Sequence, residues 1–166
     1  LFNQAAIEGS VGSVAILAEV AENIPRLTLL DTAFLTPHWG SDNGELTSVC
    51  ERYTVKGRDL AAQGFAIPED RMAVDHWWQR TWTADDCEIL TPWPVSADAP
   101  GERDKSRSVR HGLGFVPIVW IRNLGGSLGD PDGDCTFERA IDTVIEADYL
   151  LSQAGRGLKY GSDPTL

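Results

Sequence analysis

The sequence predicts an α+β fold, in which mostly antiparallel strands come first and a C-terminal amphipathic helix follows. Short segments with apolar residues at every second position fill the first two thirds of the 166 residues. Sixteen glycines and nine prolines supply frequent turns between these segments. Only one long segment, residues 136–152, repeats its apolar residues at helical spacing. We therefore expect a single domain over 1–166, β-rich over 10–122 and with a loop and helix over 123–160.

The N-terminal third is predicted to hold the end of a helix and three strands. The helix covers residues 1–8 and stops at Gly9. The strands cover residues 13–20, 27–35 and 45–55. The first strand places Val14, Ile16, Ala18 and Val20 on one face. Asn43-Gly44 predicts a tight turn before the third strand, and a change of apolar parity near Val49 predicts a β-bulge within it.

The centre of the chain is rich in tryptophan. In the segment 71–83, one parity holds Met72, Val74, His76, Trp78 and Trp82. Trp77 falls on the other parity, and a short continuation follows over 87–90. The proline-containing stretch 92–107 is expected to be the least structured part. The apolar run 115–121 predicts a buried strand.

The long helix is predicted over Thr136–Ser152. Its apolar positions are Phe137, Ala140, Ile141, Val144, Ala147 and Leu151. Thr136 is a suitable N-cap, and Glu138 suits the positive end of the helix dipole. Gly155 is expected to end the helix, or to let the chain turn there.

Charge and cysteine usage exclude several classes of function. The chain has 14 Lys and Arg against 25 Asp and Glu, a formal net charge of −11. An acidic surface repels phosphate, so a dedicated nucleic-acid-binding protein is excluded, and any DNA should be guided rather than bound. No apolar run approaches the roughly 18–20 residues of a membrane span, so no membrane partner is expected. Cys50, Cys87 and Cys135 have no CxxC spacing, which predicts free thiols and no zinc site.

One motif points towards an enzyme. Residues 125–129 read Gly-Gly-Ser-Leu-Gly, which matches the nucleophile elbow of serine hydrolases with Ser127 as the nucleophile. The elbow needs an abrupt strand-to-helix turn, but a proline, a glycine and three aspartates separate Ser127 from the predicted helix. The histidines of the chain all precede the serine, at His38, His76 and His111. Because the motif requires a later histidine, we favour a glycine-rich loop and no catalytic residue, and keep a serine hydrolase as the lesser alternative.

A second motif resembles a cation site. Asp130, Asp132 and Asp134 are spaced like the first ligands of a calcium-binding loop. That loop also requires glycine at its sixth position and glutamate at its twelfth, where this chain has Cys135 and Ile141. We therefore predict an acidic turn, with no metal and no cofactor.

The aromatic residues suggest another class. Tryptophan occurs at positions 39, 77, 78, 82, 93 and 120. Tryptophans can stack on sugar rings, so a carbohydrate-binding or other virion surface module is an alternative. Because Trp78 and Trp82 share parity with apolar residues, core or interface packing is favoured, and only Trp77 is a candidate exposed contact. The basic stretch from Arg103 to His111 is interrupted by acidic residues and predicts a solvated loop.

A family resemblance enters at residues 111–123, His-Gly-Leu-Gly-Phe-Val-Pro-Ile-Val-Trp-Ile-Arg-Asn. A glycine turn, a proline-led apolar strand closing on Asn123, a loop rich in Gly, Ser and Asp, and a helix with Ile141-Asp142 follow in order. This order resembles the wing region of tailed-bacteriophage portal proteins, over about a third of the chain from Gly112 to Leu166. The ending Ala147-Asp148-Tyr149 departs from the family's usual pattern.

The resemblance implies a structural protein and not an enzyme. Portal subunits form a homo-oligomeric ring, commonly a dodecamer, at one capsid vertex, and double-stranded DNA passes through the ring without specific binding. Terminase, capsid and connector proteins dock on this ring. The expected location is the virion, after assembly in the bacterial host cytoplasm. The chain would be a wing-like fragment of a larger protein, as its first residue Leu1 also suggests.

Overall fold

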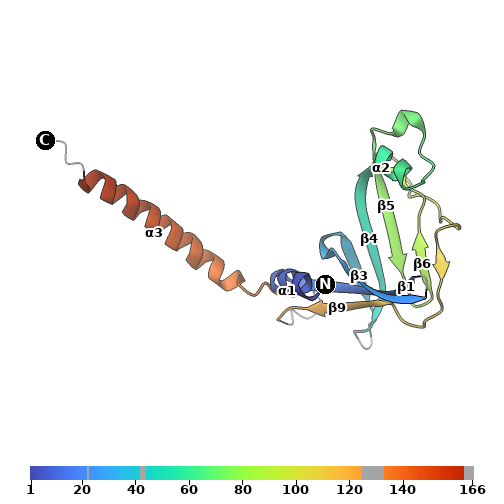
Figure 1. The fold of residues 1–166 in the computed structure, drawn as a ribbon, viewed down its shortest axis with the longest axis horizontal. Coiled ribbons are helices and arrows are strands. Elements are labelled where there is room, and N and C mark those ends of the chain that lie inside the picture. Colours follow the sequence, from blue (N-terminus) through green and yellow to red (C-terminus); the bar gives the residue numbers. More distant parts are fainter. Residues whose placement is uncertain (22, 42–43, 125–132, 163–166) are drawn as a thin grey trace. The chain divides into compact units, whose positions relative to one another are not determined.

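The computed structural model describes residues 1–21, 23–41, 44–124 and 133–162. The chain divides into two compact units (Figure 1). Unit 1 comprises Val14–Trp120 together with Leu1, and unit 2 comprises Phe2–Ser13 and Ile121–Leu166. The predicted α+β class is confirmed, with antiparallel sheets and a C-terminal helix. The expectation of a single domain stays a prediction.

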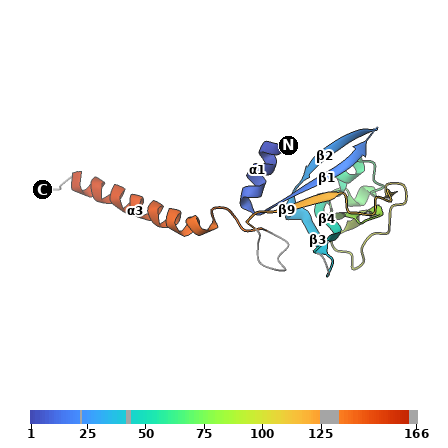
Figure 2. The same cartoon turned by 90° about the horizontal axis from the view of Figure 1, so that it is seen from below.

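The first sheet, sheet A, has three strands in the order β2-β1-β9 (Figure 2). They are β1 (Ser13–Ala21), β2 (Ile24–Leu30) and β9 (Ile118–Arg122). The first strand lies where the sequence places it, but β2 is shifted and ends at Leu30. A 3-10 turn, Thr32–Phe34, breaks the predicted strand, because the Asp31 carboxylate accepts a hydrogen bond from Ala33 N at 3.0 Å.

The second sheet, sheet B, has the order β3-β4-β5-β6-β8, with β7 paired to β5. Its strands are β3 (Leu35–Trp39), β4 (Leu46–Lys56), β5 (Asp75–Trp82), β6 (Asp86–Ile89), β7 (Trp93–Pro94) and β8 (Val109–Arg110). The register shifts between His38 and Trp39, opposite Ser48 and Leu46. The predicted bulge is therefore present in β4, at Thr47 and not at Val49.

Two predicted strands start later than expected. The strand expected over 71–83 starts only at Asp75, because a 3-10 turn (Glu69–Arg71) reaches into its first residues; a short helix α2 (Gly57–Ala62) lies further upstream. The strand expected from Phe115 starts at Ile118. The stretch 92–107 has little regular secondary structure beyond β7, in line with the prediction, but hydrogen bonds hold it in place.

Hydrogen bonds to residues outside the stretch 92–107 hold it in a defined conformation. Thr91 N donates to Glu102 O at 2.8 Å, and Glu102 N donates to Thr91 Oγ1 at 3.0 Å. Arg107 Nη2 reaches Gln63 O at 3.0 Å, and its guanidinium lies 3.9 Å from the centre of the Phe65 ring. The loop is thus fixed by polar contacts that proline and glycine content does not reveal.

The core of unit 1 lies between the two sheets. Its buried members are Ala15, Leu17, Leu30, Leu35, Val49, Trp82, Val116 and Ile118. Trp82 is only 2% exposed, and Val49 is fully buried. Each such side chain stabilises the fold by about 1.5–3 kcal/mol through loss of apolar surface to water.

Unit 2 holds two helices, α1 (Phe2–Val11) and α3 (Glu138–Ser162). Helix α1 continues past the predicted stop at Gly9, and α3 continues past Gly155. A glycine stop needs a left-handed backbone, and Gly155 is not among the residues of positive φ. Among the described helices, none is long and apolar enough to cross a membrane.

Asn123 joins the two chain segments of unit 2. Its N–H donates to Gly12 O at 2.8 Å, and its carbonyl accepts from Asp134 N at 2.9 Å. Its Nδ2 donates to Asp134 O and to Thr136 Oγ1, both at 2.8 Å. Thr136 N also donates to Ser10 O at 2.9 Å. The segment leading into α3 is therefore fixed to the end of α1, and the Thr136 hydroxyl that was predicted to cap the helix is bonded to Asn123.

Candidate functional site

The described residues give little support to the serine-hydrolase motif or to the calcium-loop motif. Ser127, Asp130 and Asp132 lie outside them. Asp134 lies inside, where its backbone N–H donates to Asn123 O and its carbonyl accepts from Asn123 Nδ2. Over the described part of the chain, no group of three or more His, Cys, Asp or Glu residues is placed to hold a metal ion. His76 is 1% exposed, with its Nδ1 3.0 Å from Val74 O, so it lies in the protein interior.

The tryptophans mostly pack inside unit 1. Trp82 and Trp93 are 2% and 7% exposed, and Trp78 stacks at 4.9 Å on Tyr53. Trp77 was the candidate exposed contact, but it is partly buried, and the Arg52 guanidinium lies 4.2 Å above its ring. A cation over the ring face occupies the surface that a sugar would use.

The basic stretch is also more ordered than expected. Arg103 reaches Asp86 at 3.5 Å and Glu88 at 3.7 Å, and Arg107 pairs with Asp104 at 3.6 Å. The Asp104 carboxylate accepts hydrogen bonds from Ser106 Oγ at 2.6 Å and from Ser106 N at 2.9 Å. The Ser106 hydroxyl is the main cause that lowers the pKa of Asp104. These pairs stabilise a loop and leave no basic patch for a phosphate backbone.

The first notable surface is the apolar stripe of α3. Every described side chain from Thr136 to Gly161 is exposed. Large apolar residues are included, with Val144 57%, Leu151 70% and Leu158 75% exposed. Apolar side chains at helical spacing normally cover a core, so this stripe lacks a packing partner among the residues that the structure describes.

The second notable surface is the outer face of sheet A, by which we mean the face turned away from sheet B. It is formed by Ile16, Ala18 and Val20 of β1, Pro25, Leu27 and Leu29 of β2, and Val119 of β9. Ala15 pairs with Leu30 and Leu17 with Thr28 on the inner face, so the intervening residues point outwards. Val20 is 73% exposed, and Leu27 and Val119 are each 57% exposed. Seven apolar residues thus form one face without a charged side chain.

The sequence prediction for β1 was incomplete at this point. Of the predicted face, Val14 is buried at 5% exposure, but Ile16, Ala18 and Val20 lie outside the core cluster, which takes Ala15 and Leu17 from the opposite face. The signal was present in the sequence, because Val14–Ala18 is continuously apolar. Such runs are typical of strands that are covered on both faces.

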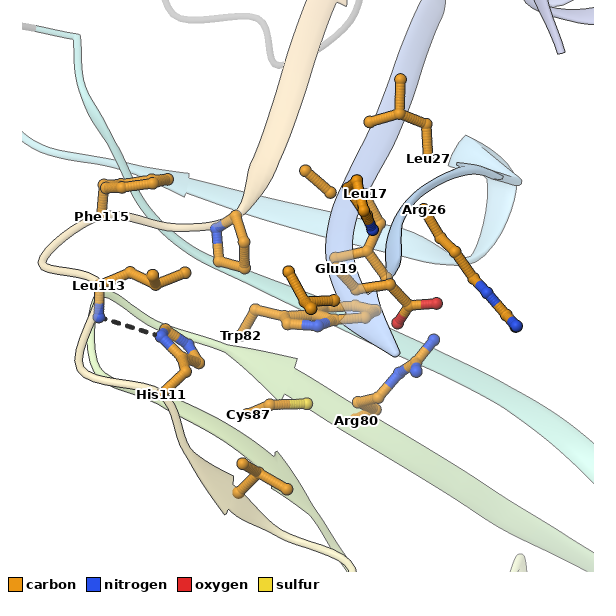
Figure 3. Close-up of a pocket in the computed structure, with 15 residues that line it drawn as sticks. Leu17, Glu19, Arg26, Leu27, Arg80, Trp82, Cys87, His111, Leu113 and Phe115 are labelled. Atoms are coloured by element: carbon orange, nitrogen blue, oxygen red, sulfur yellow. Dashed lines mark hydrogen bonds between the residues drawn. The ribbon is translucent and has the colours of Figure 1, made fainter. Parts of the chain in front are cut away.

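A groove of about 550 Å³ lies between the β1–β2 pair and sheet B (Figure 3). One wall is formed by the β1–β2 pair, at Leu17, Ala18, Glu19, Val20, Pro25, Arg26 and Leu27. The opposite wall is formed by Arg80, Trp82, Cys87, Val109, His111, Leu113, Phe115 and Pro117. The groove was not predicted from the sequence, because it depends on how the β1–β2 pair lies against sheet B.

The wall of the groove is held in place by polar contacts. Arg80 Nη2 donates to Glu51 Oε2 at 2.9 Å, and the guanidinium lies 4.2 Å from the Trp82 ring centre. Leu113 N donates to His111 Nδ1 at 3.3 Å. Burial raises the pKa of the Cys87 thiol, although the nearby Arg80 opposes this shift. The groove therefore combines apolar walls with the charged side chains of Glu19 and Arg26 at its β1–β2 side, while its thiol is neutral and its Arg80 is already paired.

No protein-family model matches this sequence, and no curated protein matches it significantly. The three apolar surfaces are therefore interpreted from their own chemistry.

Proposed function

We propose that this chain is a non-enzymatic structural subunit of a phage portal ring, where it forms part of a DNA conduit and a docking platform. In the virion it would contact copies of itself, the terminase, the capsid and the tail connector. The observation that carries this proposal is the exposed apolar stripe of α3.

The energetics favour an assembled state for α3. A helix in water gains little from backbone propensity alone, and most of its stability comes from packing its apolar face. Burying the three large side chains of the stripe, Val144, Leu151 and Leu158, would contribute about 4.5–9 kcal/mol of gross stabilisation at 1.5–3 kcal/mol each. A helix with this face in water is therefore better explained as an assembly element than as a free appendage.

Charge and strand order also agree with a portal subunit. The net charge of −11 disfavours binding to passing DNA, as a conduit requires. The segment that resembles portal proteins contributes β9 and then α3, in the order strand, loop, helix. The groove and the outer face of sheet A provide further apolar surface for protein partners.

The test is electron microscopy of the full-length gene product, together with its native mass. We expect a ring with a central hole. A monomer or dimer that is folded, as shown by the fluorescence of its buried Trp82, would contradict the proposal. Labelling by a fluorophosphonate probe that is lost in Ser127→Ala would instead support the hydrolase alternative.

Substitutions in α3 test the observation itself. Ile141→Asp together with Val144→Asp should abolish ring formation, because a carboxylate would be buried in an apolar contact. The matched control is Gln153→Asp, which adds a carboxylate to the polar side of the same helix. Rings that persist with both stripe substitutions would overturn the role of α3.

A further inference from the structure

We propose that the outer face of sheet A binds the apolar stripe of α3 from a second copy of the chain. This inference rests on the proposed ring function and names the surfaces that would join its subunits. It starts from two apolar surfaces that are exposed over the described ranges of the chain, one flat and one helical.

The stripe has a composition suited to a flat partner. Val144, Leu151 and Leu158 recur every seven residues, and Ala140, Ala147 and Ala154 recur between them at the same period. A seven-residue repeat keeps one side of a helix facing one partner along its whole length. The small alanines allow the helix backbone to approach a sheet closely, while the larger residues fit between its side chains.

The stripe is long enough to cover the outer face. From Ala140 to Leu158 it is about 27 Å long at 1.5 Å per residue. The exposed part of the outer face on β1, from Ile16 to Val20, is about 13 Å long at roughly 3.3 Å per step. A helix that lies along β1 would therefore cover this face with about half of its stripe.

The two surfaces also suit each other in size and charge. With seven apolar side chains on the sheet and six on the stripe, at roughly 70 Å² apiece, the contact would bury on the order of 900 Å². That is close to the lower limit of about 1,000 Å² for a specific protein interface. The acidic residues Asp142 and Glu146 lie on the opposite side of α3 and would stay in water.

A contact between the sheet face of one copy and the helix stripe of another fits a ring better than a contact between two identical stripes. A ring needs a head-to-tail contact between two different surfaces of the same chain. A sheet face and a helix stripe meet this requirement, whereas pairing two α3 stripes would give a closed dimer. The lead-in to α3 is fixed by the bonds of Asn123 and Thr136 within unit 2, which gives the helix a defined starting point for reaching a neighbour.

Disulfide trapping between two separately encoded copies tests the contact. Both copies carry serine in place of Cys50, Cys87 and Cys135. One copy carries Leu27→Cys, and the other, which has a mass tag, carries Val144→Cys, Leu151→Cys or Leu158→Cys in turn. The series is needed because a disulfide forms only where Cα atoms come within about 7 Å. All these positions are exposed, so folding should not be affected.

The controls use the opposite sides of the same elements. Thr28→Cys lies next to Leu27 on the other face of β2, and Gln153→Cys lies on the polar side of α3. We expect at least one stripe cysteine to give ten-fold more covalent heterodimer with Leu27→Cys than either control pair gives. The yield should change little with salt, because the contact is apolar.

The outcomes separate this inference from the proposed function. Rings without the cross-link would overturn the pairing of these two surfaces and leave the ring intact. Absence of any oligomer would count against both proposals. Cross-linking only within a single chain that carries both cysteines would show that α3 covers its own sheet, and would overturn the contact between copies.

Discussion

Strand β1 and helix α3 carry the same kind of sequence signal and differ in how it is satisfied. In β1, Ala15 and Leu17 are 0% and 3% exposed, because sheet B supplies a partner within unit 1. In α3, Leu151 is 70% exposed, although its spacing is as regular. Apolar periodicity therefore identifies the side of an element that packs against a partner. It does not show whether that partner belongs to the same chain.

The largest difference between the packed and the unpacked region should appear on truncation of a core side chain. Trp82→Ala should lower the free energy of unfolding by about 3–5 kcal/mol, because it leaves a cavity between the sheets. Val119→Ala, on the exposed outer face, is the control and should cost less than about 1 kcal/mol in the unassembled chain. Urea denaturation followed by circular dichroism measures both, and equal losses would contradict the assignment of the core.

Glycines sharpen the same comparison. A Cβ at Gly101 would overlap the backbone carbonyl of Thr91, whereas a Cβ at Gly155 meets open space. Gly101→Ala should therefore destabilise the chain by about 1–3 kcal/mol through overpacking. Gly155→Ala should raise the helix content and stabilise α3 by about 0.5–1 kcal/mol. Helicity and urea midpoints distinguish the two, and a destabilising Gly155→Ala would show that α3 is not free at this turn.

A charge in the α3 stripe should have almost no effect on the unassembled chain. Leu151→Asp should change the free energy of unfolding by no more than about 0.5 kcal/mol, as for surface substitutions elsewhere. Its effect should instead appear in sedimentation, as loss of oligomer. A loss of several kcal/mol in dilute monomer would mean that the stripe packs within its own chain.

The smallest expected effect concerns pH. Hydrogen bonds from Ser106 lower the pKa of Asp104 in the folded chain. The stability that this carboxylate supplies is therefore present above its unfolded pKa of about 3.9 and is lost as pH falls through the lower folded pKa. Asp104→Asn should flatten the acid limb of the stability curve slightly, measured as thermal midpoints between pH 5 and pH 2. An unchanged acid limb would show that Asp104 does not contribute to the loss of stability at low pH.

The sequence predicted the fold class, the position of β1 and β4, and the existence of α3, because these depend on local periodicity. It missed the break at Asp31 and the hydrogen bonds that fix the irregular stretch 92–107, because neither follows from apolar periodicity. It also missed which face of β1 enters the core, since Ile16 and Leu17 are equally apolar. The outer face of sheet A and the groove depend on which strands lie side by side, which no single segment specifies.

Asn123 has a consequence for the order of folding. It joins two stretches of unit 2, Phe2–Ser13 and Ile121–Leu166, that are separated by roughly a hundred residues. Closing a flexible loop of that length costs on the order of 4 kcal/mol of entropy. Once β1 and β9 are neighbours in sheet A, most of that entropy has already been lost. We therefore expect Asn123 and its partners to bond late in folding, and their amide protons to exchange with solvent earlier than those of β4 and β5.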